Sequence, residues 1–252
     1  MGYQSPVFDH VVIRCSDRDA SEAFYARMLG ALGIEQTASE ALAQWHDFSI
    51  TAAGPERGVT TGLHVGFVAP SREAVDRWWT IGRETGYVDA GAPGPREQYR
   101  HDYYGAFLRD PDGNSIEAVH HGALREGGNV DHVWLRVDDL GRARTFADLF
   151  ARHAGVRTRE ARVEPGVHVV TPEEAPGAGS FTYVAGEPTR NAHLALPAPR
   201  ADVDAFHAEA MRLGFQDDGA PGPRPHFAPG YYAAFVLDPG GSSFELVDRA
   251  GA

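Results

Sequence analysis

The sequence predicts an α+β protein that contains four copies of a strand–helix–strand–strand–strand module, arranged as two tandem domains. Two observations predict this fold class. The chain repeats itself after about half of its length, and within each half a short apolar strand with a histidine near its start leads twice into an amphipathic helix. A chain of 252 residues has room for two domains of ordinary size, so the repeat decides the number of domains.

The repeat is carried by motifs that return at a nearly constant offset. The motif Gly91–Arg96 (GAPGPR) returns as Gly219–Arg224, an offset of 219 − 91 = 128. Three further pairs are FDHVVIR at 8–14 with VDHVWLR at 130–136, YYGAF at 103–107 with YYAAF at 231–235, and DPDG at 110–113 with DPGG at 238–241. We therefore expect a first domain at residues 1–122 and a second at 130–252, joined by a glycine-rich linker at 123–129.

The helices are predicted from apolar residues at helical spacing, such as Ala20, Phe24 and Met28. This spacing predicts helices at residues 17–29, 71–84, 140–153 and 201–213. A glycine stands at the end of each pattern, which is typical of a helix stop. Between each helix and the next histidine strand lie short β-like runs interrupted by Gly, Pro and Asp.

The histidine strands each predict one apolar face and one face that carries the imidazole. Side chains alternate across a strand, so His10, Val12 and Arg14 share one face. The repeat places His132 and Trp134 in the same way. The opposite, purely apolar faces can pack beneath the helices, and a cleft would therefore form over the histidines.

A carboxylate lies midway along the otherwise apolar last strand of each half, at Glu117 and Glu245. Burying a carboxylate is costly unless a partner neutralises it, and a metal ion would do so. Two imidazoles and one carboxylate suit Fe(II), Mn(II) or Zn(II) and leave coordination positions open. The intervals are wide (64 − 10 = 54 and 117 − 64 = 53 residues), so three strands must converge.

For any one of these residues alone, a packed histidine or a salt-bridged glutamate is the more common structure. The recurrence of all three positions in both halves favours a metal site instead. The expected groups are His10 with His64 and Glu117, and His132 with His193 and Glu245.

Composition excludes several classes of partner. The formal net charge of −12 argues against nucleic acid or an anionic membrane as the main partner. No run approaches 18 apolar residues, so we expect no membrane-spanning helix, and the N-terminal residues lack the apolar core of a signal peptide. A single cysteine, Cys15, excludes an internal disulfide framework and is typical of a cytoplasmic protein.

At FDHV (8–11), LHVG (63–66) and DPDGNSIE (110–117), and at their counterparts in the second half, the sequence resembles the vicinal-oxygen-chelate superfamily. Its members include glyoxalase I, bleomycin-resistance proteins and extradiol dioxygenases. The resemblance implies that each half is a pair of βαβββ modules whose curved mixed sheet encloses a metal cleft, with the helices outside. The positions that match its metal ligands are His10, His64, Glu117, His132, His193 and Glu245.

The sequence departs from the glyoxalase I pattern in the last strand of the first module. That strand supplies a fourth protein ligand in glyoxalase-like members, whereas here residues 47–51 and 181–184 offer no carboxylate at the inward position. Asp47 or His46 would reach it only with a shifted register. Three protein ligands agree better with an extradiol dioxygenase.

The acid–base tyrosine that extradiol enzymes place ten residues before the ligand glutamate is also replaced, by Phe107 and Phe235. Tyr103 and Tyr231 share the strand face of these residues by parity (107 − 103 = 4) and are the candidates for this role, together with His101.

Four arginines are candidates for holding an anionic substrate. Arg14 and Arg136 lie on the histidine face of their strands. Arg96 and Arg224 close the two GAPGPR loops, which would act as lids.

Together these features predict a divalent-metal enzyme acting on a small oxygenated organic substrate, without a nucleic-acid or membrane partner. Fe2+ is favoured, with Mn2+, Zn2+ and Ni2+ as alternatives, and dioxygenase chemistry (extradiol ring cleavage) is favoured over glyoxalase, isomerase or lyase chemistry. The alternative is a non-catalytic binding or sequestration protein of the bleomycin-resistance type. The sequence leaves open whether the protein forms a homodimer.

Overall fold

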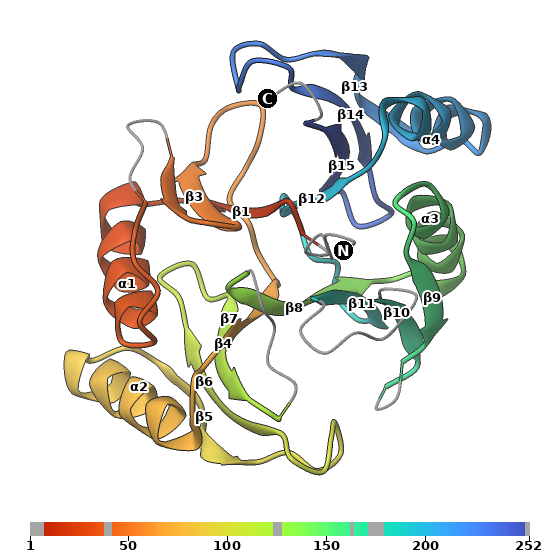
Figure 1. The fold of residues 1–252 in the computed structure, drawn as a ribbon. Helices are drawn as coiled ribbons and strands as arrows, with labels where there is room; N and C mark the ends of the chain where they lie inside the picture. The colour runs from red at the N-terminus through yellow and green to blue at the C-terminus, as the bar shows by residue number, and fades with distance from the viewer. Residues whose placement is uncertain (1–7, 38–41, 123–127, 162–163, 171–178, 250–252) are drawn as a thin grey trace, which may run out of the picture.

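The computed structural model describes residues 8–37, 42–122, 128–161, 164–170 and 179–249. These residues form four modules along the chain (Figure 1). The first two modules are β1 (His10–Cys15), α1 (Arg18–Gly30), β2 (Ala43–Trp45) and β3 (Phe48–Ala52), followed by β4 (His64–Val68), α2 (Arg72–Thr85), β5 (Asp89–Pro95), β6 (Tyr104–Arg109) and β7 (Ser115–His120). The last two are β8 (Val130–Val137), α3 (Leu140–His153), β9 (Arg157–Glu160), β10 (Gly166–Val170) and β11 (Ser180–Ala185), followed by β12 (His193–Pro197), α4 (Arg200–Arg212), β13 (Gln216–Pro223), β14 (Tyr232–Leu237) and β15 (Ser243–Asp248). The predicted fold class, α+β with four repeated modules, is confirmed, although in the described residues the first module has two strands after its helix in place of the predicted three.

The strands of the described residues form two sheets, and each sheet combines modules from both halves of the chain. One sheet has the order β13-β14-β15-β12-β1-β3-β2 and joins the first module to the fourth. The other has the order β5-β6-β7-β4-β8-β11-β10-β9 and joins the second module to the third. The expectation that each half forms its own sheet around its own cleft is therefore wrong.

The sheets cross between the halves because the first strand of each half, β1 or β8, pairs with a strand of the other half. The edge of β1 pairs antiparallel with β12, where Val12 lies opposite His193, and β4 pairs antiparallel with β8, where His64 lies opposite Trp134. Because β4 and β12 are copies of one repeat, either could accept β1. The dividing linker lies mostly outside the described residues, and the division of the chain at that place stays a prediction.

Asn129, at the start of the second half, is held by both modules of the first. Its backbone N–H donates to the carboxylate of Asp47 at 2.9 Å, and its carbonyl accepts from the N–H of Val68 at 3.0 Å. The chain therefore enters β8 beside β4, which explains why the third module joins the sheet of the second.

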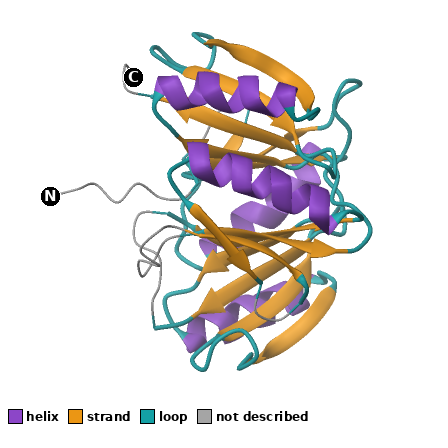
Figure 2. Ribbon diagram, turned by 90° about the vertical axis from the view of Figure 1, so that its right-hand side faces the viewer, coloured by secondary structure: helices purple, strands orange, loops and turns teal. Residues whose placement is uncertain are grey.

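The helices were predicted to within two residues of their observed bounds. The side chains of Asp17, Ser71 and Asp139 cap α1, α2 and α3 by accepting backbone N–H groups of the first turn. Figure 1 shows α1 beside α2 and α3 beside α4, and Figure 2 shows helices lying side by side on the face turned to the viewer. The helices therefore pack within halves while the sheets pair across them. Buried side chains of all four modules consequently join into one large apolar core. Among the described residues, no helix has the length and apolarity needed to span a bilayer.

The two DPxG motifs fix the turns that precede β7 and β15. Asp110 accepts hydrogen bonds from the Tyr25 hydroxyl at 2.8 Å and from the backbone of Asn114 at 2.8 Å. Asp238 accepts in the same way from Tyr183 at 2.9 Å and from Ser242 at 2.7 Å. Both carboxyl groups are buried, so these bonds set where the strand that carries each glutamate begins.

The buried carboxyl of Asp238 predicts a pH-dependent stability. Burial raises the pKa of Asp238 to about 6 from 3.8, although hydrogen bonds from Ser242 and Tyr183 partly oppose the shift. The folded state therefore binds more protons than the unfolded state between these values. The stabilisation is present below about pH 4 and is lost as the pH rises through about 6, by up to roughly 3 kcal/mol.

The measurement is the free energy of denaturant unfolding of the protein and of Asp238→Asn between pH 4 and 7. The stability of the wild type relative to the variant should fall across this range. A difference that stays constant with pH would contradict the assignment.

Candidate metal centres

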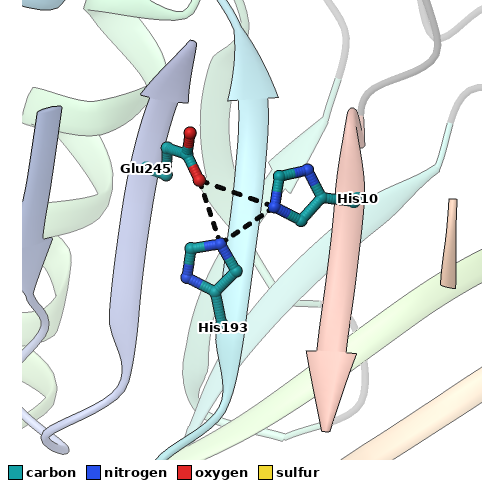
Figure 3. A group of neighbouring side chains, drawn as sticks. All are labelled: His10, His193 and Glu245. Carbon is teal, nitrogen blue, oxygen red and sulfur yellow. Dashed lines mark hydrogen bonds and ion pairs between the residues drawn. The ribbon is translucent and has the colours of Figure 1, made fainter. Parts of the chain in front are cut away.

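Two clusters of two histidines and one glutamate lie on the two sheets. Site A consists of His10 on β1, His193 on β12 and Glu245 on β15, three adjacent strands of one sheet (Figure 3). Site B consists of His132 on β8, His64 on β4 and Glu117 on β7 in the other sheet. In each site the second module of one half supplies a histidine and the glutamate, and the first module of the other half supplies the remaining histidine.

The atoms of site A converge on one point. The Nε2 atoms of His10 and His193 are 3.0 Å apart, and Glu245 Oε2 lies 3.0 Å from His193 Nε2 and 3.5 Å from His10 Nε2. Two ligands that each lie about 2.1 Å from one ion, at angles between tetrahedral and octahedral, are themselves roughly 3.0–3.4 Å apart. The three atoms therefore have the separations that one metal ion requires.

Site B repeats this triangle. The Nε2 atoms of His64 and His132 are 3.0 Å apart, and Glu117 Oε2 lies 3.2 Å from the first and 3.3 Å from the second. Both glutamates are almost completely buried, at 1% exposure, so their charge has no access to bulk water. The two sites are chemical copies at the level of their ligands.

All six residues singled out as ligands thus lie in triads, but the expected grouping is wrong. His10 does not meet His64 and Glu117, and His132 does not meet His193 and Glu245. The first histidines are exchanged between the halves, because β1 pairs with β12 and β8 pairs with β4.

A cation fits the convergence because the outer nitrogens already have acceptors. His10 Nδ1 lies 2.7 Å from Asp9, and His132 Nδ1 lies 2.9 Å from Asp131. A carboxylate can only accept, so each Nδ1 carries its hydrogen and Nε2 faces the glutamate and the second histidine. Positive charge at this point, either a proton on Nε2 or a metal ion bound by the Nε2 lone pair, offsets the charge of the buried carboxylate.

Burial and the hydrogen bonds within each site shift the pKa values of the ligands in opposite directions. Burial alone would lower the pKa of His10, but hydrogen bonds to Asp9 and Glu245 outweigh it and raise that pKa to about 9. For His132 the corresponding bonds raise the pKa to about 10. Burial lowers the pKa of His64 and of His193. The hydrogen bonds from the two histidines hold the pKa of Glu245 at about 2 against the effect of burial.

The tyrosines proposed from the sequence contact the sites through the glutamates. Tyr103 donates its hydroxyl to Glu117 Oε1 at 2.9 Å, and Tyr231 donates to Glu245 Oε1 at 2.5 Å. Burial and the neighbouring carboxylate raise the pKa of both phenols well above the ordinary value. Each phenol therefore stays protonated as a donor, orients the carboxylate and leaves Oε2 facing the histidines.

The strand position that would supply a fourth ligand carries a hydroxyl residue in each site. In site A this residue is Ser49, which pairs with Val12 of β1. The glutamate on the other side of the site, Glu245, pairs with Ala195 of β12 in the corresponding way. In site B the residue is Thr182, which pairs with Trp134 of β8. Asp47 instead binds the start of β8. The register is therefore as predicted, without a carboxylate at the inward position.

The arginines and His101 lie further out. Arg14 donates to the Asn191 carbonyl at 2.9 Å, whereas Arg136 is exposed. His101 is exposed in the turn before Tyr103, and in the described part of the chain no hydrogen bond or ion pair joins it to a triad.

The GAPGPR segments are edge strands, β5 and β13, so their interpretation as lid loops is wrong. Arg96 and Arg224 close these segments by donating to the carbonyls of Ala92 and Ala220. Because each guanidinium also lies over Phe107 or Phe235, it is held beside its site.

Sequence reasoning missed the aspartates that orient the first histidines. The signal was present, because an aspartate directly precedes the histidine in both copies, at Asp9 and Asp131. Their further partners differ: Arg249 binds Asp9, and His121 binds Asp131 at 3.0 Å.

Comparison with known proteins supports the resemblance. Residues 7–118 match the family model of the Glyoxalase/Bleomycin resistance protein/Dioxygenase superfamily. No curated protein matches the chain. Among solved structures, glyoxalase I from Zea mays is 20% identical over 98% of this chain and 93% of that chain, with a TM-score of 0.66. A putative dioxygenase from Bacillus subtilis is 14% identical over 96% and 84%, with a TM-score of 0.61. At these identities the likeness shows the fold alone, which extends over nearly the whole chain.

The cross-half grouping predicts which pairs of ligand substitutions share a site. In the double variant His10→Ala, Glu245→Ala both changes fall in site A, so the protein should keep one bound divalent ion. In His10→Ala, Glu117→Ala each site loses a ligand, so both ions should be lost. Metal content after desalting, measured by elemental analysis, distinguishes the two.

Grouping within halves predicts the reverse, with one ion retained only in the second variant. Far-UV circular dichroism of both proteins controls for folding.

Proposed function

We propose that this chain, which belongs to the Glyoxalase/Bleomycin resistance protein/Dioxygenase superfamily, is a divalent-metal enzyme that acts on a small organic substrate bound through neighbouring oxygens. The observation that carries the proposal is the pair of His-His-Glu triads. In each triad the ligand atoms have the separations expected of atoms bound to one metal ion. Two histidines and one carboxylate on one side of an ion leave the other positions open, and such sites are typical of non-haem Fe(II) oxygenases.

The fourth position favours a dioxygenase over a glyoxalase-type isomerase. Ser49 and Thr182 are neutral and almost completely buried, at 2% exposure each. Neither adds a negative charge, so a dianionic oxygen chelator meets less repulsion there than it would beside a fourth carboxylate. A divalent ion held by either triad would supply Lewis acidity to the bound oxygens.

The chain's own residues keep the ligands in place. Asp9 and Asp131 fix the ring orientation and tautomer of the first histidines, and Tyr103 and Tyr231 hold one oxygen of each glutamate. The glutamate then has one oxygen free, which limits it to a single ligand atom. Arg96 and Arg224, held over phenylalanines next to the sites, place positive charge where an anionic substrate would enter.

The alternative is a non-catalytic binding protein of the bleomycin-resistance type. A protein that only sequesters a ligand has no need of two buried His-His-Glu triads with the spacing of a metal site, which favours the enzyme.

The test is an activity comparison after anaerobic loading with Fe2+. Oxygen uptake is measured with a panel of aromatic 1,2-diols, and thioester formation with methylglyoxal and a thiol is measured in parallel. We expect Fe2+-dependent oxygen uptake by the wild type. The double variant Glu117→Gln, Glu245→Gln should lose this uptake but keep a cooperative thermal unfolding transition, which shows that it is folded. Thioester formation without oxygen uptake would contradict the dioxygenase assignment and indicate a glyoxalase-type isomerase. Loaded protein inactive in both assays would favour the binding protein.

A further inference from the structure

Sites A and B have the same ligands, but the walls beside the ligands differ. The wall on the β6 or β14 side is shared: Phe107 lies 5.9 Å from His64, and Phe235 lies 6.0 Å from His193, measured between ring centroids. The guanidinium of Arg96 lies over the ring of Phe107, and that of Arg224 lies over the ring of Phe235. A ligand bound at either site would therefore meet the same surface on this side.

In the described part of the chain, the opposite wall is aromatic in site B and not in site A. Trp134 is the β8 residue directly opposite His64, and its ring lies 6.1 Å from the imidazole in an edge-on orientation. The residue that occupies this register position in site A, opposite His193, is Val12. The substitution removes an indole from the side of the metal ligand and leaves a short aliphatic side chain.

A second aromatic residue extends this wall. Tyr99 packs edge-on against Trp134, with ring centroids 5.7 Å apart, and also contacts Tyr103 at 5.3 Å. Its backbone N–H donates to the Arg96 carbonyl at 2.9 Å, and Phe227 makes the same bond to Arg224 at 2.9 Å, so the two residues occupy equivalent turns.

Phe227 does not build the same wall in site A. Its ring contacts Tyr231 and His226, and its side chain is 59% exposed. Among the described residues, it has no aromatic partner on β1, because Val12 stands where site B has the tryptophan. Site A therefore lacks, among the described residues, the two rings that line site B on this side.

We infer that the two sites select different ligands, with Trp134 and Tyr99 as the specificity-determining residues of site B. A planar aromatic or conjugated chelator fits between Trp134 and Phe107 in site B, because offset and edge-on ring contacts add to the energy of burying the ring. Site A binds the same chelating group with little regard to whether a ring is attached. The inference rests on the proposed metal function.

A matched pair of bidentate chelators tests the inference. Benzohydroxamate and acetohydroxamate present the same two oxygens and differ in a phenyl ring against a methyl group. The Co2+-loaded variant Glu245→Gln reports on site B, and Glu117→Gln reports on site A. Dissociation constants for both hydroxamates are measured by calorimetry and by the change in cobalt absorption.

We expect site B to bind benzohydroxamate about tenfold more tightly than acetohydroxamate, and site A to show a ratio near one. Adding Trp134→Val, which installs the side chain of site A, should reduce the preference of site B to that of site A without changing its affinity for acetohydroxamate. Trp134→Phe keeps a ring and should retain most of the preference, which separates loss of the wall from loss of folding.

Equal preferences at the two sites, or an unchanged preference in Trp134→Val, would overturn the inference and leave the metal function intact. Protein that binds cobalt at neither site, or that binds it and takes up neither hydroxamate, would overturn both.

Discussion

Each site depends on one antiparallel pairing between strands from opposite halves of the chain. β1 lies against β12 and β8 lies against β4, and these pairings bring an imidazole from one half within 3.0 Å of an imidazole from the other. The same two strand pairings therefore determine both the fold and the geometry of the ligands. A shift of one residue in either pairing would turn the histidine to the helix-covered face, because side chains alternate along a strand.

These pairings explain why the sheets join modules from different halves while the helices pack within one half. α1 packs beside α2 and α3 beside α4, whereas the sheets join the first module to the fourth and the second to the third. The halves therefore share one apolar core and cannot separate without breaking both sites. Duplication has supplied two equivalent sets of ligands, and differences at positions such as Val12 and Trp134 give the two sets unequal surroundings.

Much of this was predictable from the sequence, since local patterns carry it. Strand alternation placed His10 on the face away from the core, and the repeat identified Glu117 and Glu245. The absence of a carboxylate at the fourth position also followed from the register, which leaves Ser49 and Thr182 inward. The grouping of the ligands was not predictable, because β4 and β12 are near copies and offer β1 equivalent edges. The choice depends on contacts of the linker end, such as the bond from Asn129 to Asp47, which no periodicity encodes.

The structures around Arg96 and Tyr99 were likewise not predictable from local sequence patterns. Proline and glycine in GAPGPR are typical of loops, yet the segment pairs irregularly with β6 at the sheet edge, where missing N–H donors are tolerated. Whether Tyr99 meets another ring depends on the opposite half of the chain, so no local pattern indicates it.

The central claim is that each ion is bound jointly by both halves, and anomalous diffraction from crystals grown with Co2+ or Mn2+ tests it most directly. The account predicts two anomalous peaks, one within about 2.0–2.3 Å of His10, His193 and Glu245 and one equally close to His64, His132 and Glu117. Peaks located elsewhere, or a peak coordinated by residues of one half alone, would contradict it.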